Sequence, residues 1–133
     1  MNEGRERGPI LLDTEVFIWA VAAPERLSDT ARAACESADF EVCVSVASLW
    51  EIVIKAQSGK LDIEDPVGWF VKWSSDFRLL SITARDVMEL ARMPWIHKDP
   101  FDRIILAQAI QNRMPLVTCD RQIHQYPSVA LLW

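Results

Sequence analysis

The sequence predicts an α/β protein in which a mainly parallel sheet is covered by helices on both faces. Short apolar runs alternate with stretches of helical periodicity along the chain, without an internal repeat or a long linker. Strands that are apolar throughout are typical of parallel sheets whose two faces are both buried. The length of 133 residues fits a single domain, and a chain of this size can build a core without a disulfide or a metal ion.

Five short apolar runs have the composition of buried strands. The first, PILL, ends at Asp13, and the second, FEVCVS, contains Cys43, which is most simply a core residue. The fourth, PLVT, is stopped by Cys119 and Asp120. We therefore expect strands over residues 9–12, 40–45, 78–82, 115–118 and 129–132.

Local capping signals place helices between these strands. Ser28 is a good N-cap, and Asp65 and Asp99 each precede a proline, which is favoured at the first helical position. Thr83, with Asp86 three residues later, forms a variant of the capping box. We expect helices over residues 16–22, 29–37, 46–57, 66–77, 84–93, 100–113 and 121–125. The helix after Asp65 carries an aromatic stripe, which either packs in the core or marks an assembly surface: Trp69, Phe70, Trp73 and Phe77.

Composition and charge exclude several classes of protein. With 50% hydrophobic and 25% charged residues, the chain is typical of a globular domain and not of a disordered protein or a coiled coil. The longest clean apolar run, residues 16–23, is far shorter than the roughly 20 residues that cross a bilayer. The net charge of −5 would repel phosphate at long range, so contact with a nucleic acid requires local basic residues or a bound cation.

The chain start and the cysteines indicate the compartment. MNEGRERG lacks the apolar stretch of a signal peptide, and we expect residues 1–8 to be a disordered extension before a single domain over residues 9–133. Cys35, Cys43 and Cys119 are scattered and odd in number, which favours reduced thiols and a cytoplasmic protein.

Acidic residues recur where the strands are expected to end, and ligands of open parallel sheets bind beyond these carboxyl ends. Asp13 follows the first strand, and Asp120 follows the fourth. Glu51 lies in the second turn of the helix after the second strand, and Asp102 lies in the first turn of the helix after Asp99. If the strands before Asp13 and Asp120 are neighbours, four carboxylates can converge on one cleft. Such an all-oxygen set suits Mg²⁺ or Mn²⁺ and not Zn²⁺.

Each acid also has a simpler interpretation. Asp13 and Asp120 could cap the helices that follow them, and Asp99 is expected to cap its helix. Glu51 could form an ordinary surface ion pair with Lys55, four residues later. The recurrence of acids near one sheet edge in four separate segments favours a shared site.

Four segments resemble the successive motifs of PIN-domain proteins, and more narrowly those of VapC-type toxins of bacterial toxin–antitoxin pairs. They are ILLDTEVFIWA, VSVASLWEIVIKAQSGKL, HKDPFDRIILAQAI and PLVTCDRQIHQY, and the resemblance covers residues 10–133. It implies a three-layer α/β/α sandwich. By motif position it implies four catalytic, metal-binding acids: Asp13, Glu51, Asp102 and Asp120. Asp99 would cap its helix or support these acids. Many relatives carry His where this chain has Glu15, which adds negative charge near the site but removes none of these acids.

The implied activity is that of a Mg²⁺- or Mn²⁺-dependent endoribonuclease that cleaves single-stranded RNA. Metal held by Asp13 and Asp102 would activate water for in-line attack on phosphorus, while Glu51 and Asp120 complete the metal's surroundings. Thr118 could hold a water or a phosphate oxygen. Three basic residues could attract phosphate, although each is more simply a solvated surface residue: Lys55, Lys98 and Arg103.

The resemblance also implies partners. A cognate antitoxin would mask the cleft by placing an Arg or Lys near Asp13 and Asp102, since a guanidinium matches carboxylates well. A homodimer is expected, with Trp69 or Trp73 near its interface. We expect His97 and the other histidine to lie at the surface or to support a ligand, because neither shows ligand spacing with a cysteine.

Other functions stay open at this point. Without an antitoxin, a stand-alone RNA-processing nuclease is the better interpretation. A phosphohydrolase with Asp13 as nucleophile is less favoured, because haloacid dehalogenases need a second Asp where Glu15 stands. The intact acid set argues against a non-catalytic binding module. No Ser-His-Asp or Cys-His set is evident, so a protein nucleophile is not expected.

Overall fold

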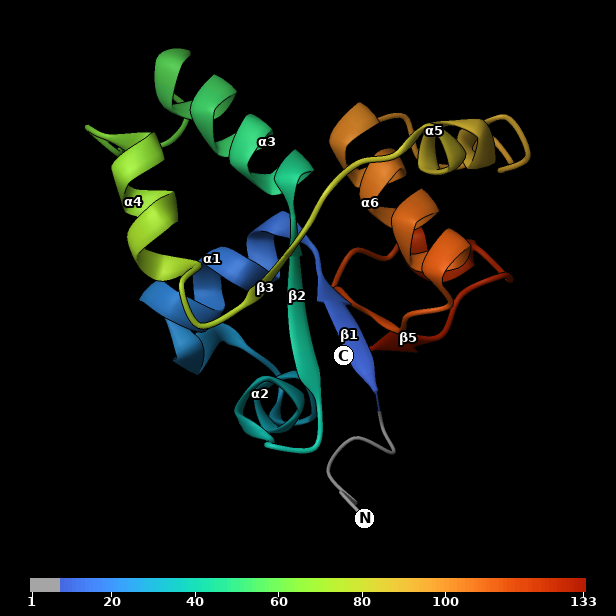
Figure 1. The fold of residues 1–133 in the computed structure, drawn as a ribbon, viewed down its shortest axis with the longest axis horizontal. Helices are drawn as coiled ribbons and strands as arrows, with labels where there is room; N and C mark the ends of the chain where they lie inside the picture. The colour runs from blue at the N-terminus through green and yellow to red at the C-terminus, as the bar shows by residue number, and fades with distance from the viewer. Residues whose placement is uncertain (1–7) are drawn as a thin grey trace.

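The computed structural model describes residues 8–133, so the predicted extension over residues 1–8 lies outside the described residues except for Gly8. The described strands form one sheet in which all neighbours are parallel, in the order β3-β2-β1-β4-β5 (Figure 1). Their bounds are β1 (Pro9–Leu12), β2 (Glu41–Ser45), β3 (Arg78–Leu80), β4 (Leu116–Val117) and β5 (Leu131–Leu132). The predicted parallel sheet is confirmed, and the strands after β1 are one to two residues shorter than predicted.

The strand order reverses at β1. From this central strand the chain first builds the sheet on one side, through β2 and β3, and later on the other side, through β4 and β5. Leu12 therefore pairs with Val44 of β2 and with Val117 of β4. Such a reversal opens a crevice beyond the carboxyl ends of the two strands where the direction changes. Asp13 and Thr118 directly follow these paired residues, so two segments far apart in sequence meet at this edge.

The helices agree closely with the capping signals. Ser28 accepts a hydrogen bond from the backbone N–H of Ala31 at 3.0 Å, and Thr83 and Asp86 form the reciprocal capping box. Helix α6 ends where Arg113 adopts the left-handed conformation, with φ of 54°. The helices are α1 (Thr14–Ala22), α2 (Asp29–Glu36), α3 (Val46–Gln57), α4 (Pro66–Trp73), α5 (Ala84–Leu90) and α6 (Pro100–Asn112). Two 3₁₀ turns complete them: η2 (Pro24–Arg26), which was not predicted, and η3 (Ile123–Gln125).

Two apolar clusters cover the two faces of the sheet and make a three-layer structure. Ile10 and Leu12 belong to one cluster and Leu11 to the other, as expected from the alternation of side chains along a strand. The first cluster packs against α1–α4, and the second packs against α6 and its neighbour α5 (Figure 1). Among residues 8–133, no helix is long and apolar enough to cross a membrane.

The predicted aromatic stripe is divided between the core and the surface. Helix α4 ends at Trp73, so Phe77 lies beyond it, yet the rings of Phe77 and Trp69 both pack edge-on against Phe17, with centroids 5.6 and 5.9 Å away. Phe70 is buried in the same cluster. Trp73, by contrast, is 39% exposed.

Candidate active site

A cleft of about 450 Å³ opens at the carboxyl ends of β1 and β4, with residues of α1 on one side and residues of α3 on the other. The first turns of these two helices are joined by a hydrogen bond between the buried hydroxyls of Thr14 and Ser48, at 2.9 Å. All the predicted acids line this cleft: Asp13, Glu51, Asp99, Asp102 and Asp120.

Asp13 both caps α1 and lines the cleft. Its Oδ1 accepts a hydrogen bond from the backbone N–H of Val16 at 2.8 Å, and its carboxylate also bonds to the hydroxyl of Thr118. The residue is only 5% exposed. Burial raises the pKa of Asp13 to about 6; nearby Glu15 and Asp120 add to the increase, while the two hydrogen bonds oppose it. Capping and a role in the cleft are therefore compatible in one residue.

Thr118, for which a water or a phosphate oxygen was the predicted contact, hydrogen-bonds to two of the acids. Its side chain is fully buried and does not line the cavity. Its hydroxyl bonds to the Asp13 carboxylate and accepts a hydrogen bond from the backbone N–H of Asp120 at 3.1 Å. The threonine thus fixes the positions of Asp13 and Asp120 relative to each other.

Glu51 forms the predicted ion pair with Lys55, but not as a surface pair. The Lys55 Nζ lies 2.6 Å from Oε2 of Glu51, which is only 3% exposed. Oε1 of the same carboxylate is buried and has no hydrogen-bond partner among the described residues. Buried polar atoms without a partner are rare, and this one stands at a cleft lined by other carboxylates.

Asp102 is held at the cleft by the start of α6. The preceding Asp99 caps this helix as predicted, because its Oδ1 accepts hydrogen bonds from the backbone N–H groups of Phe101 and Asp102 at 2.9 and 3.0 Å. Burial, together with the charges of Asp99 and Glu51, raises the pKa of Asp102 to about 7, and His97 partly opposes the increase.

His97 joins two of the acids and was not identified from the sequence as part of the site. Its Nε2 lies 2.8 Å from Oδ2 of Asp120 and 3.2 Å from Oδ2 of Asp102. Of the two positions expected for it, at the surface or supporting a ligand, the structure fits the second, since the residue is only 7% exposed. Its Nδ1 accepts a hydrogen bond from the backbone N–H of Asp99 at 3.0 Å, so a neutral ring carries its proton on Nε2 and donates it to the carboxylates. A histidine two residues before an aspartate N-cap was the available signal.

The residues of the cleft fit a divalent cation. Four segments supply carboxylate oxygens, and the buried Oε1 of Glu51 has no partner in the part of the chain that the structure describes. Burial and neighbouring negative charge raise the pKa values of Asp13 and Asp102. A divalent cation would offset the repulsion between the clustered carboxylates, and hard cations such as Mg²⁺ and Mn²⁺ prefer oxygen ligands of this kind. Atoms of three residues lie within 4.8 Å of one another and could hold an ion: His97, Asp102 and Asp120. The proton on Nε2 favours the ring as a donor to the acids over the ring as a ligand.

Arg103 is neither the solvated surface residue that was the simpler expectation nor free to attract phosphate, the alternative that was left open. Its guanidinium is buried and donates hydrogen bonds to the carbonyl oxygens of Leu90 and Pro94, at 3.2 and 3.3 Å. It also stacks on the ring of Trp95, 4.3 Å from the centroid. Arg103 therefore fixes the loop between α5 and α6. Of the other basic candidates, Lys98 is exposed and Lys55 lines the cleft.

Among the residues of the cleft that sequence reasoning did not select, three carry a positive charge or an indole ring: Trp19, Arg26 and Lys60. Arg26 ends the unpredicted turn η2, and Lys60 lies in the loop after α3. No spacing or motif connects these two residues, because loop geometry alone brings them to the cavity.

Comparison with known proteins agrees with this architecture. The PIN domain family matches residues 10–129. Ribonuclease VapC22 of Mycobacterium tuberculosis is 34% identical over 128 residues, which are 93% of this chain and 98% of the relative. VapBC2 of Rickettsia felis, solved with a promoter DNA fragment, matches with a TM-score of 0.69 and 16% identity over 92% of this chain and 96% of that chain. VapBC-5 of Mycobacterium tuberculosis matches with a TM-score of 0.59 and 18% identity over the same shares. The two structural matches show a shared fold.

Proposed function

Because the chain belongs to the PIN-domain family and to its VapC-type branch, we propose that it is the toxin component of a toxin–antitoxin pair and acts as an endoribonuclease. The observation that carries the proposal is the convergence of four carboxylates from four segments on one cleft, where a buried oxygen of Glu51 has no hydrogen-bond partner among residues 8–133. The relative at 34% identity is named as a ribonuclease, which supports the same reaction class.

The proposed ligands of Mg²⁺ or Mn²⁺ are Asp13, Glu51, Asp102 and Asp120. When bound, such a cation supplies a Lewis acid that lowers the pKa of water and balances charge on the phosphate. The protein's own contribution is to hold the acids rigidly: Thr118 hydrogen-bonds to Asp13, and His97 contacts both Asp102 and Asp120. Rigid placement of such groups saves reorganisation during the reaction.

The proposed substrate is single-stranded RNA. Asp13 and Glu51 are buried, Asp102 and Asp120 are half-buried, and all four line the cleft beside α1 and α3, so a phosphodiester must enter the cleft to reach them. The rotatable backbone of a single strand enters more easily than a duplex. Lys55 lines the same cleft beside Glu51 and offers a positive charge for the incoming phosphate.

One assay tests the reaction. Purified protein should cleave an end-labelled single-stranded RNA in the presence of Mg²⁺ or Mn²⁺, and EDTA should stop the cleavage. The products should carry 5′-phosphate and 3′-hydroxyl ends, because water attacks phosphorus. Asp102→Asn should abolish cleavage, while Asp62→Asn, an exposed acid elsewhere, should not. A 2′,3′-cyclic phosphate product would show that the ribose hydroxyl attacks and would refute the mechanism.

The proposed partners are a cognate antitoxin and a second copy of the chain. VapBC complexes among the structural matches support an antitoxin, which would place an Arg or Lys near Asp13 and Asp102 and so block access. The exposed apolar side chains of α4 support a homodimer interface around Trp73; Trp69, in contrast, mostly packs on Phe17. A cytoplasmic location follows from these roles.

A further inference from the structure

The cleft has two chemically different ends. One end holds the acids that follow β1 and β4; at the other, the Arg26 guanidinium lies over the Trp19 ring, and Lys60 also lines the cavity. The proposed metal site accounts for the acidic end only. A basic end that shares one cavity with it needs a separate explanation.

One face of α1 connects the two ends. Glu15, Ile18 and Trp19 are spaced three and four residues apart, so they share this face, and all three line the cleft. The rise of α1 places Trp19 about 9 Å along the helix axis from Asp13. A ligand that spans the cleft therefore extends beyond the acids by a length comparable to one nucleotide unit.

Arg26 is prepared to bind an anion in the plane of its guanidinium. The guanidinium carbon lies 4.7 Å from the centroid of the Trp19 ring, and that ring is itself packed against Trp133, with centroids 6.1 Å apart. Stacking occupies a face of the guanidinium and leaves its N–H donors, which lie in its plane, available. No carboxylate of the described residues forms an ion pair with Arg26, unlike Lys55, which is paired with Glu51.

We propose that Arg26, held by Trp19 and assisted by Lys60, binds the phosphate that neighbours the scissile phosphodiester in the RNA. This inference rests on the proposed ribonuclease function and adds a substrate subsite to it. A cation here would also offset the repulsion between RNA and the acid-rich end of the cleft. The scissile phosphate would then be placed by two contacts, one at the acids and one a nucleotide away.

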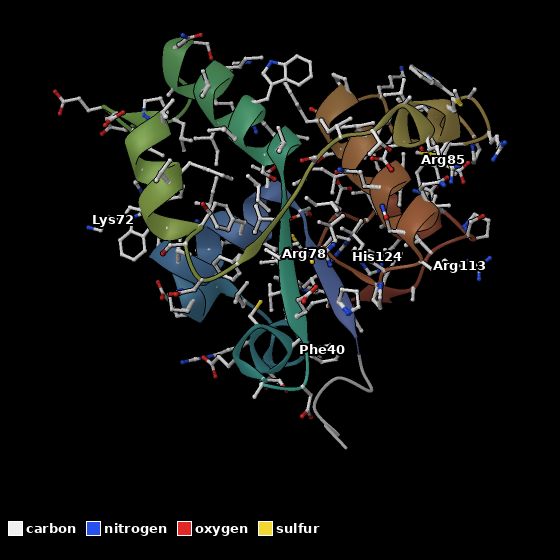
Figure 2. All side chains as sticks on the ribbon, viewed as in Figure 1. Phe40, Lys72, Arg78, Arg85, Arg113 and His124 are labelled. Atoms are coloured by element: carbon white, nitrogen blue, oxygen red, sulfur yellow. The ribbon has the colours of Figure 1, made fainter. Side chains whose placement is uncertain are left out.

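The test combines a variant with substrates that lack one charge. Arg26→Gln should weaken binding of a short RNA about tenfold, measured by fluorescence anisotropy with Ca²⁺ as the cation. It should also reduce the salt-dependence slope of log K by about 0.7, the value for one phosphate contact on a single strand. Arg85→Gln is the matched control, because Arg85 is an exposed arginine on α5, away from α1 and η2 (Figure 2).

A set of RNAs with a neutral methylphosphonate at one position each identifies the contacted phosphate. In the wild-type protein, neutralising the phosphate next to the cleavage site should raise KM about tenfold, and the same change should have no effect in Arg26→Gln. Thermal unfolding of Arg26→Gln should match the wild type, because the side chain is exposed.

The outcomes separate the two proposals. If the wild type cleaves RNA and Arg26→Gln binds and cleaves equally well, the subsite is wrong and the ribonuclease function stands. If Arg26→Gln weakens only the binding of an antitoxin, the basic end is a protein-binding site and the subsite is again wrong. If the wild type neither binds nor cleaves RNA, both proposals fail together.

Discussion

The Nε2 atom of His97 lies 2.8 Å from the Oδ2 atom of Asp120, so the loop before α6 is tied directly to the segment after β4. The same nitrogen lies 3.2 Å from Oδ2 of Asp102. Asp102, in the first turn of α6, and Asp120, after β4, are thereby held close to the same nitrogen atom. The imidazole ring of His97 therefore sets how far apart the two carboxylates lie.

Removal of this ring should weaken metal binding. We expect His97→Ala to reduce Mn²⁺ affinity by about 10- to 100-fold, the usual cost of losing a group that orients a ligand, as measured by isothermal titration calorimetry. His124→Ala is the control, because His124 is exposed and its Nε2 contacts only the carbonyl oxygen of Thr118. Equal affinities of His97→Ala and the wild type would contradict an orienting role.

Divalent metal should stabilise the folded protein through the acids of the cleft. Mg²⁺ or Mn²⁺ at millimolar concentration should raise the Tm of the wild type, because a ligand that binds only the native state shifts unfolding. Asp13→Asn and Asp102→Asn should lose most of this increase; Asn keeps the helix cap at Asp13, so the loss reports on the metal site. Asp62→Asn is the control. No divalent binding by the wild type in calorimetry would refute the assignment.

The metal-free protein should become more stable as the pH falls. Burial raises the pKa of Asp13 to about 6 and the pKa of Asp102 to about 7 in the native state. At a pH between the lower pKa values of the unfolded chain and these native pKa values, the native state binds more protons than the unfolded state. Their contribution is fully present at acidic pH and is lost as the pH rises through 6 to 7. Urea unfolding in EDTA should give a higher free energy of unfolding at pH 5.5 than at pH 8. The variant with both Asp13→Asn and Asp102→Asn should show a smaller difference in the free energy of unfolding between these two pH values. An unchanged difference would show that other groups cause the pH dependence.

Arg103 should matter for stability and not for RNA charge recognition. Arg103→Ala leaves buried carbonyl oxygens of the α5–α6 loop without their donor and removes the stack on Trp95, so the free energy of unfolding should fall by about 2–3 kcal/mol in urea titration. Arg92→Ala, which alters an exposed arginine paired with Glu89, should change it by less than about 0.5 kcal/mol. Comparable small losses in both variants would mean that the Arg103 contacts contribute little.

The homodimer should form through α4. Light scattering at tens of micromolar, a working concentration of the order needed for a stable interface, should give the mass of two chains. Trp73→Glu should yield monomers, because the change places a charge on an exposed apolar face. Val87→Glu, an equally apolar exposed position on α5, should leave the dimer intact. The opposite result for the two variants would place the interface on α5.

The backbone was predictable from the sequence where a local signal decides it. Ser28 and Asp99 predict where their helices begin, because capping is a contact between a residue and its immediate neighbours. The helix after Asp65 ends before Phe77, because tertiary packing on Phe17 and not periodicity decides the position of that ring.

The convergence of the four acids on one cleft was predictable for a similar reason, because each directly follows a strand or lies in the first turns of a helix. Burial was not predictable. Glu51 and Lys55 have the spacing of a surface ion pair, and only the packing of α3 shows that Glu51 is buried. Arg103 has the charge of a phosphate ligand, but the path of a loop between two helices surrounds it with carbonyl oxygens. Sequence spacing carries no information about such long-range enclosure.

The central place of β1 has a consequence for the order in which the protein becomes active during its synthesis. β1 is the first described strand to leave the ribosome, yet one of its edges has no partner until β4 has been translated. Asp120 is the last of the four acids in chain order, and Thr118, which steadies Asp13, comes with β4. A nascent chain that already contains α1 to α6 therefore carries three of the acids without the strand that completes their setting. Under the proposed ribonuclease function, a translation product interrupted before β4 should therefore not cleave RNA.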